Sequence, residues 1–124
     1  LSSRKAIVLA LYGELGSGKT TFVQGLAQGL KIKKRIISPT FVFIRPYAIS
    51  HKQYTFYHID LYRIEKLEDT RGLGLEEILD NPTNIIAIEW AEKIGNILPK
   101  KRIDVKFEIL GENGRRITTS YRDY

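Results

Sequence analysis

The chain has 124 residues, the usual size of one domain, so we expect a single domain spanning residues 1–124. Its hydrophobic content of 43% is enough for a sizeable core, and its charged content of 27% is ordinary for a soluble protein. It has no cysteine, which excludes disulfides and cysteine-bound metals, and no apolar run approaches the ~20 residues that a membrane span requires. We therefore expect no membrane partner. The net charge of +6 favours acidic partners such as RNA or an acidic protein face.

Positive charge is concentrated in three clusters, Lys31–Arg35, Lys100–Arg102 and Arg115–Arg116. No aromatic residues interleave with them, as a base-stacking platform would need. The clusters therefore leave two interpretations open. They contact an acidic partner, or they form a solvated surface that keeps a small protein in solution.

The first predicted unit is a strand, a loop and a helix. Ala6–Tyr12 is a continuous apolar run, typical of a buried parallel strand. Gly13–Thr20 matches G-x-x-x-x-G-K-[ST], the phosphate-binding P-loop. Thr21–Leu30 then carries apolar residues at helical spacing. The motif thus lies in the strand–loop–helix setting that phosphate binding requires.

Each residue type in the loop suits a triphosphate with a metal ion. The glycines let the backbone bend and bring its N–H groups against phosphate oxygens, at the positive end of a helix dipole. Lys19 supplies an ammonium for the outer phosphates, and Thr20 offers a hydroxyl to Mg²⁺. We predict that ATP or ADP with Mg²⁺ is bound by Gly13, Glu14, Leu15, Gly16, Ser17, Gly18, Lys19, Thr20 and Thr21.

Two strands and a broken helical segment are predicted next. Phe41–Ile49 and Tyr54–Tyr62 are rich in β-branched and aromatic residues and read as strands, with a hairpin loop at Ser50–Gln53. Ile64–Leu79 is predicted to be helical in pieces, interrupted at its two glycines.

The remaining elements complete a mixed sheet. Ile85–Ile88 predicts a second buried strand, Ala91–Leu98 a short helix ended by a proline, and the alternating segments Ile103–Leu110 and Arg116–Tyr121 a terminal hairpin. Buried parallel strands together with hairpins indicate a P-loop NTPase-like α/β sandwich, with a mixed parallel and antiparallel central sheet flanked by helices.

Two acids are candidates to complete the Mg²⁺ site, because a P-loop needs a carboxylate at the end of a hydrophobic strand. Glu89 follows Ile85–Ile88 and is the better metal ligand. Asp60 ends the earlier strand; it competes for that role, orients a water, or simply forms a turn. Thr40 lies in a loop after the P-loop helix, where it senses the γ-phosphate or closes a turn.

Other polar residues are given ordinary roles. His58 shares a strand face with Asp60 and is interpreted as a structural histidine. Trp90 is interpreted as packing. Asp69–Gly72 spells D-x-x-G, but it follows no apolar strand, and no guanine-reading N-K-x-D motif is present. GTP is therefore disfavoured.

Four segments follow one another along the chain: Gly13–Phe22, Ser38–Phe41, His58–Arg63 and Ile88–Trp90. Together and in this order they resemble the TsaE family (formerly YjeE), the small P-loop ATPases of bacterial tRNA threonylcarbamoyladenosine synthesis. The H-x-D-L-Y-R and I-E-W segments are the discriminating ones.

The nucleotide motif favours a cytoplasmic location. The resemblance implies ATP binding, with Mg²⁺ held by Thr20 and Glu89. It implies weak ATPase activity stimulated by the partners TsaB and TsaD, with tRNA as an indirect partner. Asp60 and Thr40 match switch-like positions, and Arg115 resembles the arginine of a late Gly-Arg pair near the nucleotide. The resemblance also predicts a longer segment ahead of the first strand than Leu1–Lys5. Because the chain has no methionine, we expect it to start after a removed initiator or to be a trimmed form.

The residues favour an ATPase in which Lys19, Thr40, Asp60 and Glu89 are the catalytic candidates, and the resemblance implies that partners control it. Two alternatives remain open at this level. A small-molecule kinase would need an acceptor pocket and an arginine-bearing lid, and a non-hydrolysing nucleotide-gated scaffold or RNA-binding module would draw on the positive charge.

Overall fold

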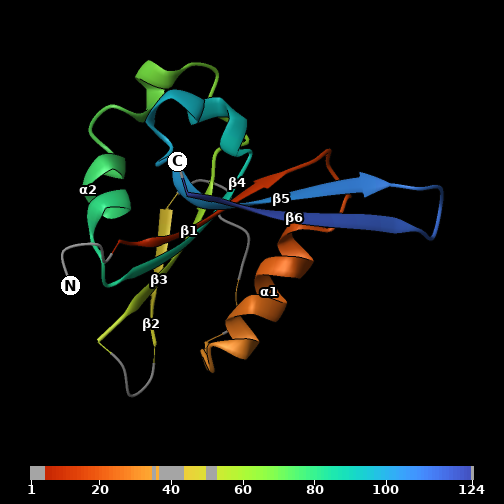
Figure 1. Ribbon diagram of the computed structural model, residues 1–124, viewed down its shortest axis with the longest axis horizontal. Helices are drawn as coiled ribbons and strands as arrows, with labels where there is room; N and C mark the ends of the chain where they lie inside the picture. The colour runs from red at the N-terminus through yellow and green to blue at the C-terminus, as the bar shows by residue number, and fades with distance from the viewer. Residues whose placement is uncertain (1–4, 35, 37–43, 50–52, 124) are drawn as a thin grey trace.

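The computed structural model describes residues 5–34, 36, 44–49 and 53–123, and these build one mixed sheet with helices on both faces (Figure 1). The strands lie in the order β2-β3-β4-β1-β5-β6. They are β1 (Ile7–Tyr12), β2 (Ile44–Ala48), β3 (Thr55–Asp60), β4 (Asn84–Glu89), β5 (Lys101–Ile109) and β6 (Arg115–Asp123). The helical elements are α1 (Lys19–Gly29), the 3₁₀ helix η1 (Leu67–Thr70), α2 (Leu75–Asp80) and the 3₁₀ helix η2 (Ala91–Ile97).

The four central strands β3, β4, β1 and β5 run parallel, and a hairpin partner closes each edge. β4 pairs in parallel with both β1 and β3, and β5 pairs in parallel with β1. β2 and β6 pair antiparallel with β3 and β5. The predicted class of fold is therefore confirmed, including the mixture of strand directions.

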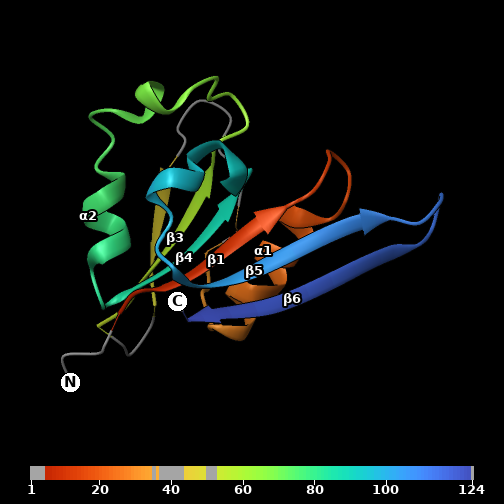
Figure 2. The ribbon, with the colours of Figure 1, turned by 45° about the horizontal axis from the view of Figure 1, so that its top comes forward.

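Side chains alternate between two cores because both faces of the sheet are covered. In β4, Ile86 and Ile88 pack on the face that carries α2 and η2, whereas Ala87 belongs to the core beneath α1. Figure 2 shows these layers and the β5–β6 hairpin extending beyond α1. Glu89, two residues after Ala87, consequently lies on the α1 face of the sheet.

The predicted segments match the observed elements with shifted ends. The helix after the P-loop begins at Lys19 instead of Thr21, because Gly18, at φ 105° and in the left-handed region, is its N-cap. The interrupted helix appears as η1 and α2, and α2 starts after the left-handed Gly74. Residues 37–43 and 50–52 lie outside the described part, so the first portion of the predicted strand and most of its hairpin loop are not tested.

No helix within the described ranges is long and apolar enough to cross a bilayer.

The sheet core predicts a clear difference between two isoleucines. Ile88→Ala should lower the free energy of unfolding by about 2–5 kcal/mol, because this side chain is 0% exposed and its loss leaves a cavity between β4 and η2. Ile7→Ala, at 49% exposure on β1, should cost much less. Urea unfolding of both variants checks the prediction, and equal losses of unfolding free energy would contradict the difference in burial between Ile88 and Ile7.

Candidate functional site

A cleft of about 320 Å³ opens where the carboxyl ends of β1, β3 and β4 meet. This is the edge of an open α/β sheet where ligands bind. Its lining comes from the P-loop and the two neighbouring strand ends: Glu14, Leu15, Gly16, Gly18, Lys19, Thr20, Thr21, Asp60, Tyr62, Glu89 and Trp90. The tertiary structure thus gathers most of the predicted site residues into one place.

The P-loop is bent sharply and stays open towards the cleft. Gly13 has φ 152°, and a Cβ there would lie 2.8 Å from Ser17 Oγ and 2.9 Å from the carbonyl oxygen of Phe107. No side chain fits at that position. At Gly16 and Gly18, by contrast, a Cβ would meet no atom within 4 Å, so the loop leaves room for a phosphate group to approach its backbone.

Lys19 is folded into this loop and is only 5% exposed. Its ammonium donates hydrogen bonds to the carbonyls of Gly13 and of Glu14, the latter at 3.1 Å, and lies 4.2 Å from the centre of the Trp90 ring. Burial lowers the pKa of Lys19, while the negative charge of Glu89 acts in the opposite direction. The cleft therefore holds a cation whose hydrogen-bond partners are uncharged carbonyl oxygens.

Thr20 and Glu89 form the contact that joins the loop to the sheet. The hydroxyl of Thr20 lies 3.2 Å from each carboxylate oxygen of Glu89, which is 3% exposed. Within the described ranges, no three His, Asp or Glu side chains gather as an all-protein metal cage. Mg²⁺ commonly takes only one or two protein ligands and completes its shell with phosphates and water. A hydroxyl beside a carboxylate at the mouth of a phosphate loop therefore fits this ion.

Asp60 lies beside Glu89 as its register partner on β3. One of its oxygens, Oδ1, accepts a hydrogen bond of 3.0 Å from the backbone N–H of Tyr62, so it also forms the turn that the sequence left open. Burial raises the pKa of Asp60 and the charge of Glu89 adds to this, whereas the Tyr62 hydrogen bond opposes it. Two carboxyl groups at one cleft edge repel each other until a cation joins them.

Arg115 brings the terminal hairpin into contact with the P-loop. Its Nε and Nη2 donate to the carbonyl oxygen of Gly16 at 3.3 and 3.1 Å, and its Nη1 donates to that of Gly114 at 2.8 Å. The guanidinium thus lies against the loop that would hold the phosphates, although 99 residues separate it from Gly16 in the chain. Thr40, the remaining candidate, lies outside the described residues.

Sequence reasoning underrated two residues of the site. His58 is fully buried, as a structural histidine should be, but its Nε2 lies 2.6 Å from Oε2 of Glu89. Trp90 packs on Tyr62 with ring centres 5.4 Å apart, as expected, and also faces Lys19. The sequence did place His58 and Asp60 on one strand face, which was the available sign that His58 belongs to the site. Their nearness to Glu89 depends on the pairing of β3 with β4, which the sequence does not show.

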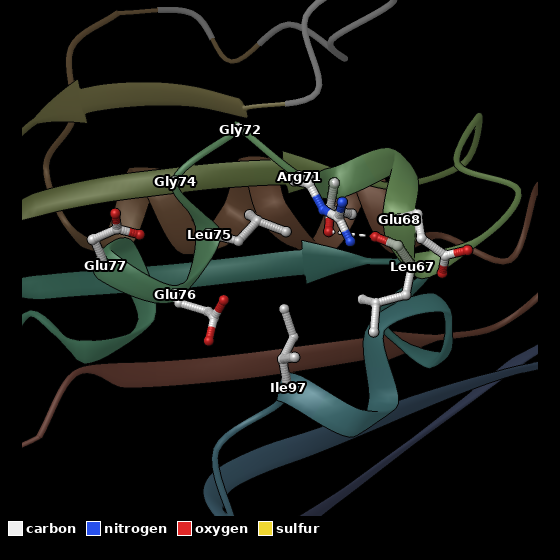
Figure 3. Close-up of a pocket in the computed structure, with 10 residues that line it drawn as sticks. Leu67, Glu68, Arg71, Gly72, Gly74, Leu75, Glu76, Glu77 and Ile97 are labelled. Carbon is white, nitrogen blue, oxygen red and sulfur yellow. Dashed lines mark hydrogen bonds between the residues drawn. The ribbon is translucent and has the colours of Figure 1, made fainter.

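A second cavity, of about 420 Å³, lies between η1 and α2 (Figure 3). Leu75 and Ile97 point into it, and Glu68, Glu76 and Glu77 stand around it with a single arginine. Such carboxylates repel phosphates, so this cavity is not the nucleotide site. The nearby D-x-x-G sequence is structural, because the side chain of Asp69 accepts hydrogen bonds from two backbone N–H groups ahead of η1.

The parallel sheet, the strand–loop–helix and the strand-end carboxylate define a P-loop NTPase-like protein. The chain belongs to the TsaE family: the model of the threonylcarbamoyl adenosine biosynthesis protein TsaE matches residues 1–117. The family acts in tRNA threonylcarbamoyladenosine biosynthesis.

Individual relatives agree with this assignment. The tRNA threonylcarbamoyladenosine biosynthesis protein TsaE of Treponema pallidum is 39% identical over 113 residues, covering 91% of this chain and 81% of the relative. That of Borreliella burgdorferi is 42% identical over 105 residues, covering 84% and 74%. The crystal structure of Bacillus subtilis YdiB superposes with a TM-score of 0.74 at 34% identity, covering 97% of this chain and 70% of that one.

The shape of the P-loop predicts that Gly13→Ala is damaging. The added methyl group meets Ser17 and Phe107 in a backbone region that favours glycine, so the free energy of unfolding should fall by roughly 1–3 kcal/mol. Gly25→Ala is the matched control, since its Cβ meets nothing within 4 Å and lies in α1, where alanine should add about 0.5–1 kcal/mol. Thermal unfolding of the two variants compares them; a harmless Gly13→Ala would refute the tight packing.

The burial of Asp60 predicts a pH-dependent gain from Asp60→Asn. A carboxyl group whose folded-state pKa is raised binds its proton more tightly in the folded state, so it destabilises the fold once the pH exceeds the unfolded pKa. Asp60→Asn should therefore raise the melting temperature at pH 7 in magnesium-free buffer, and the difference should shrink as the pH falls towards 4. Asparagine retains the acceptor for Tyr62. A variant less stable at pH 7 than at pH 4, relative to the parent, would disprove this.

Proposed function

We propose that the chain is a Mg²⁺-dependent ATPase of the cytoplasm, slow on its own and activated by TsaB and TsaD, which supports tRNA threonylcarbamoyladenosine modification. The observation that carries the proposal is the Thr20 hydroxyl within 3.2 Å of both oxygens of Glu89, at the mouth of an open P-loop. The adjacent Lys19 and the amino end of α1 supply positive charge for a triphosphate.

The residues of the cleft divide the work of hydrolysis. The loop backbone and Lys19 hold the phosphates and stabilise the charge that develops on the transferred group. Thr20 and Glu89 hold Mg²⁺, which when bound neutralises charge on the outer phosphates. Asp60 orients a water whose oxygen bonds to the γ-phosphorus as the bond to the bridging oxygen breaks, which yields ADP and inorganic phosphate.

Arg115 serves the loop more than the reacting group in this scheme. Its guanidinium already contacts the carbonyl oxygens of Gly16 and Gly114, so it braces the loop and links it to the hairpin. No arginine lines the cleft within the described ranges, which agrees with slow turnover by the isolated chain.

The rim of the cleft supports control by partners. Leu15 and Tyr62 are 63% and 47% exposed and stand at two sides of the opening. Exposed apolar side chains beside a polar cleft offer surface that a partner protein can bury. TsaB and TsaD are the partners of the family in this proposal, and tRNA is reached through them.

Substitution of Asp60 tests the assignment of roles. Asp60→Ala should keep ATP affinity within a few-fold but lower the ATPase rate measured with TsaB and TsaD by about 100-fold, the usual range for a group that positions or deprotonates water. Lys19→Ala should lose both binding and turnover. Phosphate release and calorimetry measure the two quantities, and an Asp60→Ala protein with its full stimulated rate would refute the role of Asp60.

Phosphate release, together with a measurement of RNA binding, separates the ATPase from the two alternatives. Phosphate released without any acceptor supports hydrolysis, whereas transfer to a nucleoside or sugar would identify a kinase. RNA binding that falls steeply with salt while turnover stays absent with the partners present would identify a nucleotide-gated RNA-binding module.

A further inference from the structure

The carboxylate of Glu89 bonds to a residue that strand register alone would not select. Asp60 is the residue directly opposite Glu89 on β3, and His58 is opposite Ala87, two positions back. The contact of 2.6 Å nevertheless joins Glu89 Oε2 to His58 Nε2, diagonally across the two strands. The small side chain of Ala87, 0% exposed on the same face, leaves space for this diagonal.

The direction of this hydrogen bond follows from its chemistry. A carboxylate only accepts hydrogen bonds, so the proton is on Nε2 of His58. The other ring nitrogen, Nδ1, has no hydrogen-bond partner among the described residues. A fully buried imidazole with one satisfied contact is costly compared with an apolar residue of the same size, so that single contact is the useful feature of this side chain.

Glu89 has a competing partner in the cleft. Lys19 is close enough for the charge of Glu89 to act on it, and its ammonium contacts two carbonyl oxygens and the Trp90 ring, none of them charged. A Glu89 carboxylate free to rotate would gain by pairing with that ammonium, and it would then leave Thr20 without its neighbour. His58 holds one oxygen back from this alternative.

We propose that His58 is a positioning residue for the metal site: by holding Oε2 it fixes the orientation of the Glu89 carboxylate and keeps Oε1 beside the Thr20 hydroxyl, as the oxygen pair offered to Mg²⁺. The inference rests on the proposed function, because it refines the metal site assigned there. Hydrogen bonds to ligating groups typically account for 10- to 100-fold in metal affinity.

Three substitutions separate the hydrogen bond from the volume of the ring. His58→Gln places an N–H donor the same number of bonds from Cα as Nε2, His58→Asn places it one bond short, and His58→Leu keeps similar bulk without a donor. Calorimetry measures the dissociation constant of a non-hydrolysable ATP analogue in EDTA and in millimolar Mg²⁺. The magnesium ratio is the dissociation constant in EDTA divided by that in Mg²⁺. Thermal unfolding of each variant records stability separately.

Nucleotide affinity in EDTA should fall less than affinity in Mg²⁺ in all three variants, because His58 is no phosphate ligand in this scheme and a released Glu89 competes with the triphosphate only for Lys19. The magnesium ratio should fall about 10- to 100-fold in His58→Leu and His58→Asn and should be largely retained in His58→Gln. In a Glu89→Gln background, His58→Leu should have no further effect on the ratio. Where His58→Leu does not fold, the comparison of His58→Gln with His58→Asn decides.

Two results would overturn the inference while leaving the proposed function intact: a parental magnesium ratio in His58→Leu or His58→Asn, or an equal loss of affinity with and without Mg²⁺. A parent protein that binds nucleotide with no dependence on Mg²⁺ would instead remove the proposed metal site, and this inference with it. A parent that binds no nucleotide at all would refute the proposed function first.

Discussion

Strands β1 and β4 run side by side in the same direction, with Leu11 opposite Glu89. The P-loop leaves the sheet directly after β1, and α1 returns across the face on which Glu89 stands. The first turn of α1 therefore meets the end of β4, and Thr20 reaches the carboxylate of Glu89. Without the parallel register between these two strands, Thr20 of the phosphate loop would not meet the carboxylate of Glu89.

The cleft built on this register is an arrangement of charges that are incompletely matched in the protein itself. Lys19 is buried against carbonyls and an indole ring, and Asp60 and Glu89 stand next to each other on adjoining strands. Burial lowers the pKa of the lysine and raises that of the aspartate. Under the proposed function, a triphosphate with Mg²⁺ would supply opposite charges to both sides, and its site would be organised before the ligand arrives.

Contacts from distant parts of the chain hold this arrangement. Arg115 joins the terminal hairpin to Gly16, and Lys93 in η2 donates a hydrogen bond of 2.8 Å to the carbonyl of Ile64 after β3. Lys93 also lies 5.6 Å from the centre of the Trp90 ring. The segments that follow β3 and β4 are thereby tied together at the cleft.

The sequence alone was enough for whatever depends on neighbouring residues. A P-loop is contiguous, a buried parallel strand is a continuous apolar run, and an acid at the end of such a run is visible as Glu89. These features predicted the class of fold correctly, and four short segments in order predicted the family. They also singled out Thr20 and Glu89, which the structure places in contact. Only the tertiary structure decided that His58 bonds to Glu89, that Trp90 covers Lys19 and that Arg115 contacts Gly16. Those contacts depend on strand order, on register and on the path of a hairpin. They join residues that lie far apart in the chain, and the periodicity of a sequence carries no information about such pairs.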